Sequence, residues 1–303
     1  SAGIIVGASG TILQSIDSGL TWNIIALTSK PDLLTVLSPG VETFIAGSQS
    51  SFWISVDGGK SFTERKHSVM GPFSSYALLT PTSLYGIGSS QVAVGEGPAR
   101  YQTSRPSITF RSVVYSNKDS SSNTAFAVAT NGYLYRSLDG GKTWGNLYLP
   151  TTSTLYNVSF YDKNVVVVGT AGIVFYSADE GDSWNQANPG TQRDLYGVVV
   201  YKLRAVAVGQ YGTLLLSTDG GQSWNPLTAP QPPSSTSHLN SVAFKDSLVF
   251  AVGSSGWIIQ SSDSGSTWTK VSHSLTTSTL RGVYYYSINS NVIAVGSNGT
   301  ILY

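Results

Sequence analysis

The chain has 303 residues, of which 41% are hydrophobic and only 11% are charged, and its formal net charge is +1. This near-neutral balance creates no global field for a polyanion, so we expect no nucleic-acid partner. The chain has no cysteine, which excludes disulfides, zinc–thiolate sites and thiol catalysis. No apolar run approaches the roughly 20 residues that cross a bilayer, so we expect a chain that does not span a membrane.

The predicted elements are short strands, rich in Val, Leu, Ile, Tyr and Trp and bounded by turn residues. The first is Ile4–Gly7 and the last is Thr300–Tyr303. Between them the chain repeats a unit of four strands, A to D. In one copy these strands are Leu195–Tyr201, Arg204–Gly209, Gly212–Ser217 and Ser223–Leu227.

An eight-residue box, Ser-x-Asp-x-Gly-x-Thr/Ser followed by an aromatic residue, joins strands C and D in most copies. Its aspartates are Asp17, Asp57, Asp139, Asp179, Asp219 and Asp263. Its aromatic residue is Phe62 in one copy and otherwise Trp22, Trp144, Trp184, Trp224 or Trp268. Most steps between these aspartates are 40 to 44 residues, and the step of 82 from Asp57 to Asp139 spans two periods. A degenerate copy, Glu96 to Tyr101, lies in that gap.

Four-stranded antiparallel units that repeat at this period are typical of a propeller. We therefore predict one all-β domain over residues 1–303, a β-propeller of four-stranded antiparallel blades. Eight blades are predicted, with seven as the alternative. The first copy begins at strand B and the last ends at strand C, so both end blades are expected to be incomplete. A segment before Ser1 would supply the missing strands, or the open edges would pair between copies of the chain in a homo-association.

The box residues have a structural interpretation. Glycine supplies the positive φ of the turn, and aspartate accepts backbone N–H bonds within it. The tryptophan begins strand D and packs back over the hairpin. We therefore predict that the box aspartates and tryptophans stabilise the C–D hairpins and perform no chemistry.

The run Val208–Trp224, Val-Gly-x-x-Gly-x-Leu-x-x-Ser-x-Asp-x-Gly-x-Ser-Trp, resembles the Asp-box (BNR-repeat) propellers. Within that group the chain most resembles the photosystem II assembly factor family, whose propellers also end on a short strand such as Gly299–Tyr303. The resemblance covers nearly the whole chain and implies a propeller fold. It also implies an assembly factor that docks a membrane-protein precursor on a basic patch.

The acidic residues offer little for catalysis. Most of the 16 fall in boxes or in A–B turns, and only Asp32 and Asp194 precede A strands. Those two come from blades several positions apart, whereas a glycosidase needs two carboxylates about 5 to 9.5 Å apart. We therefore predict no enzymatic activity, with a glycan-cleaving propeller enzyme as the alternative. The three histidines lack the short spacing of a metal motif, so we predict no metal and no cofactor.

The predicted binding surface is the rim formed by B–C turns and D–A loops. The first position of each A strand is apolar, whereas the second varies. This is typical of a contact surface around a channel, and the alternative is that these residues only line a solvated channel. The second positions, together with one loop arginine, are Arg111, Tyr156, Tyr196, Asn240, Arg281 and Arg193. The same rim carries further basic residues, Lys30, Arg65, Lys66, His67 and Arg105. This excess of positive charge predicts an acidic or carboxylate-bearing partner.

Low charge and many Ser and Thr residues favour an exported protein, extracellular or on the cell surface, with the thylakoid lumen or periplasm as alternatives. Asn298 begins a glycosylation sequon in an exposed turn, which would make the chain a glycoprotein, whereas the Asn157 sequon falls inside an A strand. We predict a protein- or glycan-binding scaffold. A self-associating structural subunit of an extracellular assembly is a further alternative.

Overall fold

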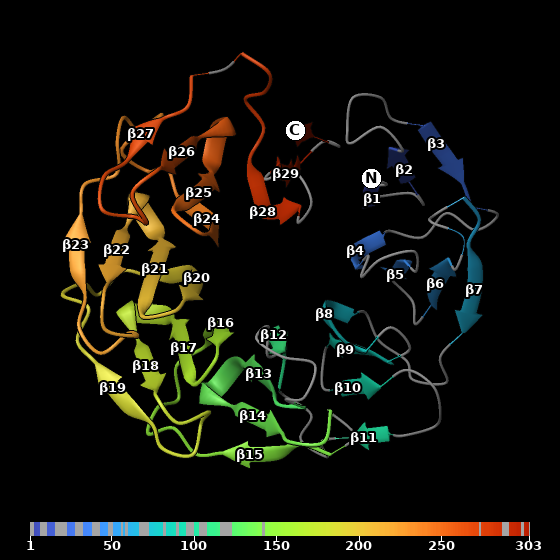
Figure 1. Ribbon diagram of the computed structural model, residues 1–303, viewed down its shortest axis with the longest axis horizontal. Coiled ribbons are helices and arrows are strands. Elements are labelled where there is room, and N and C mark those ends of the chain that lie inside the picture. The colour runs from blue at the N-terminus through green and yellow to red at the C-terminus, as the bar shows by residue number, and fades with distance from the viewer. Residues whose placement is uncertain are drawn as a thin grey trace. The chain divides into compact units, whose positions relative to one another are not determined.

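The computed structural model shows an all-β chain of short strands joined by tight turns (Figure 1). The residues that it describes are 3–6, 11–15, 23–27, 33–37, 43–47, 51–55, 57, 60–66, 73–80, 83–88, 91–94, 100–102, 108–115, 123–140, 143–272, 274–286, 291–297 and 300–302. These residues belong to two compact units. Unit 1 comprises Ser1–Tyr115, Asn123–Ala129 and Tyr135–Leu147, and unit 2 comprises Ser116–Ser122, Thr130–Leu134 and Tyr148–Tyr303.

The strands that begin the chain form four antiparallel sheets, each made of strands consecutive in sequence. The first has three strands, β1 (Gly3–Val6), β2 (Thr11–Ser15) and β3 (Asn23–Ala26). The second has β4 (Leu33–Leu37), β5 (Thr43–Gly47), β6 (Ser51–Ser55) and β7 (Thr63–Lys66). The third has β8 (Phe73–Thr80), β9 (Ser83–Gly88), β10 (Gln91–Val94) and β11 (Arg100–Gln102). The fourth has β12 (Phe110–Tyr115), β13 (Ala125–Ala129), β14 (Leu134–Ser137) and β15 (Gly145–Leu147).

The remaining strands lie in unit 2 and repeat the same antiparallel order. The first of these sheets has β16 (Leu155–Tyr161), β17 (Asn164–Gly169), β18 (Val174–Ser177) and β19 (Asn185–Ala187). The next has β20 (Leu195–Tyr201), β21 (Arg204–Gly209), β22 (Leu214–Ser217) and β23 (Asn225–Leu227). The next has β24 (Leu239–Lys245), β25 (Leu248–Gly253), β26 (Ile258–Ser261) and β27 (Thr269–Lys270). The last has three strands, β28 (Leu280–Tyr286), β29 (Asn291–Gly296) and β30 (Ile301–Leu302).

Among the described strands there are thus six four-stranded sheets and two three-stranded ones. This agrees with the prediction of eight blades of which the first and last are incomplete. The first sheet contains strands B, C and D of the repeat, and the last contains A, B and C. Of the degenerate box, residues 96–99 lie outside the described residues, and Arg100 and Tyr101 belong to β11.

The predicted bounds of strands C and D are wrong by about two residues. Strand β22 begins at Leu214 and not at Gly212, because Gln210–Gly212 forms a 3-10 turn whose central residue, Tyr211, has φ 54°. Strand β23 begins at Asn225, because the box hairpin extends through Trp224. The same 3-10 turn recurs at the B–C junctions of the three complete neighbouring sheets, at Thr130–Gly132, Thr170–Gly172 and Ser254–Gly256.

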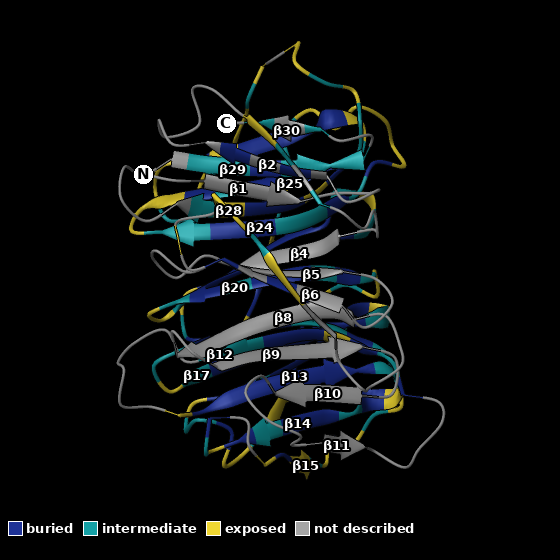
Figure 2. Ribbon diagram, turned by 90° about the vertical axis from the view of Figure 1, so that its right-hand side faces the viewer, coloured by how far each residue is buried: buried dark blue, intermediate teal, exposed yellow. Residues whose placement is uncertain are grey.

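The core lies between neighbouring sheets, and the B strands are its centre. Strand β13 is buried at every residue (Figure 2), and β17 and β21 are buried from their second residue onward. Continuous apolar runs of this kind are typical of strands that are buried on both faces of a sheet. In unit 2, Val166 of one sheet and Val198 of the next belong to one cluster with Trp224, which is 7% exposed.

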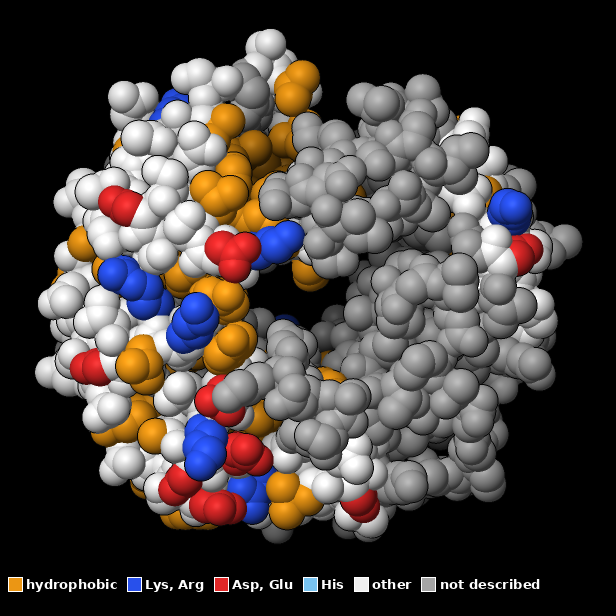
Figure 3. Space-filling model, in the orientation of Figure 1, with side chains coloured by type: hydrophobic (Ala, Val, Ile, Leu, Met, Phe, Trp, Pro, Cys, Tyr) orange, Lys and Arg blue, Asp and Glu red, His pale blue; other side chains and the backbone are white. Residues whose placement is uncertain are grey.

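Backbone hydrogen bonds define two rims. On the box rim, the N–H of Gly220 in a box donates to the carbonyl of Leu203 in the A–B turn at 2.7 Å. On the loop rim, the N–H of Gly132 in a B–C turn donates to the carbonyl of Ser153 in a D–A loop at 2.7 Å. The face seen in Figure 3 gathers apolar side chains over β16, β20 and β24, among charged side chains of both signs.

Candidate functional site

A β-bulge begins the A strand of seven sheets. The register shifts between Leu33 and Thr35, Phe73 and Ser75, Phe110 and Ser112, Leu155 and Asn157, Leu195 and Gly197, Leu239 and Ser241, and Leu280 and Gly282. A bulge leaves one residue out of the ladder and re-aims its side chain. In the last five sheets that residue is the predicted rim position: Arg111, Tyr156, Tyr196, Asn240 and Arg281.

A close backbone approach accompanies the bulge. Gly209 is the ladder partner of Leu195 and lies close to Asp194, the residue before Leu195. A Cβ on Gly209 would stand 2.0 Å from the carbonyl oxygen of Asp194. A Cβ on Gly253 would stand 1.9 Å from the carbonyl oxygen of His238. Only glycine allows this contact, so strand B closes tightly on the start of strand A and sets the bulge on the loop rim.

Four aromatic side chains on the loop rim of unit 2 make successive contacts. Ring centroids are 5.5 Å apart between Tyr156 and Tyr196, 5.9 Å between Tyr196 and His238, and 5.4 Å between His238 and Tyr211. Tyr211 is 46% exposed. Burial and then the neighbouring Asp194 carboxylate raise the pKa of Tyr196 above its ordinary value. We call these residues the aromatic row.

Side-chain acceptors hold the 3-10 turns beside the row. The imidazole Nδ1 of His238 accepts the backbone N–H of Tyr211 at 3.0 Å, which leaves the neutral ring with its proton on Nε2. One sheet earlier, Oδ1 of Asp194 accepts the N–H of Ala171 at 2.9 Å. Asp194, which the sequence offered as an acid for catalysis, is therefore engaged in a turn. Asp32 lies outside the described residues.

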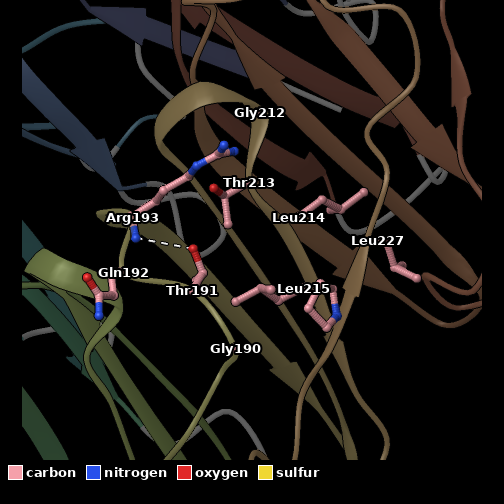
Figure 4. A pocket seen from close by; sticks show the side chains of 10 residues that line it. Gly190, Thr191, Gln192, Arg193, Gly212, Thr213, Leu214, Leu215 and Leu227 are labelled. Atoms are coloured by element: carbon pink, nitrogen blue, oxygen red, sulfur yellow. Dashed lines mark hydrogen bonds between the residues drawn. The ribbon is translucent and has the colours of Figure 1, made fainter.

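Arg193 continues the row towards a groove. Its guanidinium Cζ lies 5.6 Å from the centroid of the Tyr211 ring, and its Nη1 donates to the Tyr211 carbonyl at 3.5 Å. Figure 4 shows Arg193 and Thr213 beside each other at this groove. The groove holds about 540 Å³. Its lining residues are Gly190, Thr191, Gln192, Arg193, Gly212, Thr213, Leu214, Leu215, Pro226 and Leu227.

The other predicted rim residues are engaged elsewhere. The Asn240 amide Nδ2 donates to the Leu280 carbonyl at 2.8 Å, which joins two A strands. Arg281 is exposed, and its Nε donates to Ser297 Oγ at 3.2 Å. Arg111 is exposed in unit 1. Sequence reasoning missed His238 and Tyr211 as parts of the row, although His238 directly precedes an A strand and Tyr211 occupies the centre of a B–C turn.

Several predicted positions cannot be placed. Asp17, Trp22, Asn298, Lys30, His67 and Arg105 lie outside the described residues, as do the side chains of Arg65 and Lys66. The Asn157 side chain is half-buried, and its Oδ1 accepts the N–H of Val198 at 3.1 Å. Asn157 therefore ties two A strands together.

The five described boxes share one set of hydrogen bonds. In the box of Asp219, Oδ1 accepts the Ser217 hydroxyl at 2.8 Å and the Ser223 N–H at 3.0 Å, while Oδ2 accepts the Ser223 hydroxyl. The indole N–H of Trp224 donates to the Gly221 carbonyl at 2.9 Å. The equivalent bonds of Asp179, led by those from Ser183, lower its pKa to about 2. The equivalent aspartate bonds recur at Asp57, Asp139 and Asp263.

In the part of the chain that the structure describes, no three His, Asp or Glu side chains are placed to hold a metal ion. Among those same residues, no helix is long and apolar enough to cross a bilayer.

Comparison with known proteins decides the family. The model of the family described as photosynthesis system II assembly factor YCF48 matches residues 102–197 and 201–282, which is more than half of the chain. The chain belongs to this family. A search of curated protein sequences found no match for this YCF48-family chain.

Solved structures show the same fold. The structure described as YCF48 bound to D1 peptide matches with a TM-score of 0.62 and 19% sequence identity. The match covers 99% of this chain and 88% of the chain in that structure. YCF48 from Cyanidioschyzon merolae has a TM-score of 0.61 and 18% identity, with coverages of 99% and 90%. The computationally designed Ika8 protein reaches 0.69 at 12% identity, covering 89% of this chain and 82% of its own. Membership and fold together identify this chain as a BNR-type β-propeller related to the assembly factor.

Proposed function

We propose that this chain is a non-catalytic assembly scaffold that binds an extended protein segment on the loop rim of unit 2. The observation that supports this proposal most directly is the aromatic row, whose last ring, Tyr211, contacts the exposed guanidinium of Arg193. Tyrosine and arginine are the side chains that most often dominate binding energy at protein interfaces. The bulges support the proposal because they turn Tyr156 and Tyr196 out of the sheet ladder.

The partner that this surface favours is acidic or carboxylate-bearing. Arg193 and Arg281 are both exposed in unit 2, whereas the Asp194 carboxylate already accepts a backbone N–H. A carboxylate beside Arg193 would form a charge-assisted hydrogen bond while the Tyr211 ring supports the guanidinium. Arg281 would add electrostatic steering and little affinity of its own.

Family membership favours a protein partner over a glycan. A related structure is described as YCF48 bound to D1 peptide, and the family is named for assembly of photosynthesis system II. We therefore infer a photosystem protein segment as the partner of this chain, and the thylakoid lumen as its compartment in place of the extracellular one.

The test is binding of a fluorescently labelled D1 peptide, measured by fluorescence anisotropy at low salt. We expect Tyr196→Ala and Arg193→Ala each to raise Kd by about tenfold or more. The matched control is Tyr161→Ala, because Tyr161 and Tyr201 form a similar edge-on pair, with centroids 5.0 Å apart, at the opposite end of the same A strands. Equal Kd values for wild type and both rim variants would refute the loop rim as the binding surface.

A further inference from the structure

The groove beside Arg193 lies where one loop meets the outer strands of the next blade. Loop residues 190–193 lie on one side of the groove and Leu227 of β23 lies on the other (Figure 4). Leu214 and Leu215, which are buried, and Pro226 complete the apolar part of the lining. The lining thus combines apolar side chains with the hydroxyl of Thr191 and the guanidinium of Arg193. This composition suits an apolar side chain that carries or neighbours a carboxylate.

Thr213, the residue that follows the 3-10 turn of this sheet, lines the groove. The residue after the 3-10 turn donates its N–H back across the turn in each complete sheet from β12 onward, which identifies equivalent positions. In three of these sheets, the glycine that ends strand B also donates its backbone N–H to the carbonyl of this residue, which is Ile173, Thr213 or Trp257. The equivalent residues are Tyr133, Ile173, Thr213 and Trp257. Thr213 has the shortest side chain of these four, and the last, three-stranded sheet also has a threonine, Thr300, at this position.

Trp257 shows where a large side chain at this position packs. Its ring is 1% exposed, and its Cη2 lies 2.9 Å from where a Cβ on Gly212 would stand. Its indole N–H donates to the Pro230 carbonyl of the D–A loop at 3.2 Å. An aromatic ring is therefore received between a B–C turn and a D–A loop, with a loop carbonyl as acceptor. Gly190, the counterpart of Pro230 along the loop, lines the open groove.

We infer that the Thr213 groove receives a bulky apolar side chain of the bound segment, whose neighbouring carboxylate pairs with Arg193. The inference rests on the proposed function for the identity of the partner. The groove is continuous with the aromatic row, because Arg193 lines the groove and contacts Tyr211. A segment that crosses the row therefore reaches the groove without leaving the loop rim.

The first test fills the groove with side chains that the chain already uses at this position. Thr213→Ile copies Ile173 and Thr213→Tyr copies Tyr133. We expect Kd for the labelled D1 peptide to rise about threefold and about tenfold respectively, in order of volume. Thr213→Val is the matched control, because it keeps the volume and removes only the hydroxyl bond to the Gln210 carbonyl, 2.6 Å long. Its Kd should stay within about twofold of wild type.

A second test does not depend on the peptide. N-acetyl-tryptophan, which has a ring and a carboxylate, is titrated against the isotope-labelled protein by NMR, with N-acetyl-tryptophanamide as the uncharged probe. We expect shifts of the Thr191, Arg193 and Leu227 amides with the acid, weaker shifts with the amide, and none in Thr213→Tyr. The Ile variant supplies the same comparison if the Tyr variant does not fold.

The outcomes separate the two proposals. If Tyr196→Ala weakens peptide binding while Thr213→Ile and Thr213→Tyr bind as wild type, the rim stands and the groove inference is wrong. If the peptide fails to bind wild type but N-acetyl-tryptophan shifts the groove amides, the groove stands and the D1-type partner is wrong. Absence of groove shifts in the wild-type protein overturns the inference outright.

Discussion

His238 accepts the backbone N–H of Tyr211 through its imidazole Nδ1 at 3.0 Å, across 27 residues of sequence. The same bond is made one blade earlier by a carboxylate, from Asp194 to the N–H of Ala171. Tyr211 and Ala171 both have φ 54°, a left-handed conformation that costs energy for a residue with a Cβ. The side-chain acceptor before each A strand therefore secures a strained turn on the loop rim.

Removing the His238 acceptor should destabilise the turn, whereas replacing His238 with aspartate, the acceptor of the neighbouring blade, should not. We expect His238→Ala to lower the free energy of unfolding by about 1 kcal/mol and to weaken peptide binding, because Tyr211 loses its support. His238→Asp should retain the stability, since Asp194 already performs the same bond. Urea denaturation followed by circular dichroism measures both. Equal losses in the two variants would contradict the acceptor role.

Removing a box should affect folding. Asp219→Ala deletes the acceptor of the Ser217 and Ser223 bonds and should cost about 1–3 kcal/mol. Trp224→Ala should cost about 3–5 kcal/mol, because the ring is 7% exposed within the core. Thr218→Ala, at the exposed spacer of the same box, is the control. Unchanged thermal midpoints for the Asp219 and Trp224 variants would disprove the structural role.

Acid should weaken the boxes. Hydrogen bonds from Ser183 hold the pKa of Asp179 at about 2, below its usual 3.8, and the pKa of Asp57 and Asp263 is also lowered. A carboxylate with a depressed folded-state pKa contributes stability above its unfolded pKa and loses it as the pH falls through the folded value. The free energy of unfolding should therefore decline between about pH 4 and pH 2. Asp179→Asn, which cannot titrate, should show a shallower decline, and parallel curves for the two proteins would argue against the linkage.

The bulge should depend on glycine at the end of strand B. Gly209→Ala places a Cβ 2.0 Å from the Asp194 carbonyl oxygen, so something must shift. We expect a loss of about 1–3 kcal/mol in unfolding free energy, with displaced NMR signals for Tyr196. Gly145→Ala is the matched control, because its Cβ would meet only the Arg136 carbonyl at 3.8 Å. A Gly209→Ala protein as stable as the control would show that the close approach is dispensable.

The repeat itself made the fold predictable. Box residues bond to partners two to four positions away, as Asp219 does with Ser217 and Ser223, so the pattern is visible in the linear chain. The strong periodicity of the box and of the apolar runs was sufficient to predict antiparallel blades, their number and the incomplete first and last sheets. The ends of the strands were predicted less exactly, because a three-residue 3-10 turn such as Gln210–Gly212 is too short to show a repeating apolar pattern in the sequence.

The candidate site was only partly visible in the sequence. Aligning A-strand starts drew attention to Tyr156 and Tyr196, but not to their contact with each other, nor to His238 and Tyr211. Those contacts join residues 27 to about 40 positions apart on different blades, and their geometry depends on how neighbouring blades pack. The groove is lined by Thr213, whose side chain is smaller than those of its counterparts Ile173 and Trp257. Sequence alone determined the repeating unit through short-range bonds, whereas packing between blades decided which side chains share the loop rim.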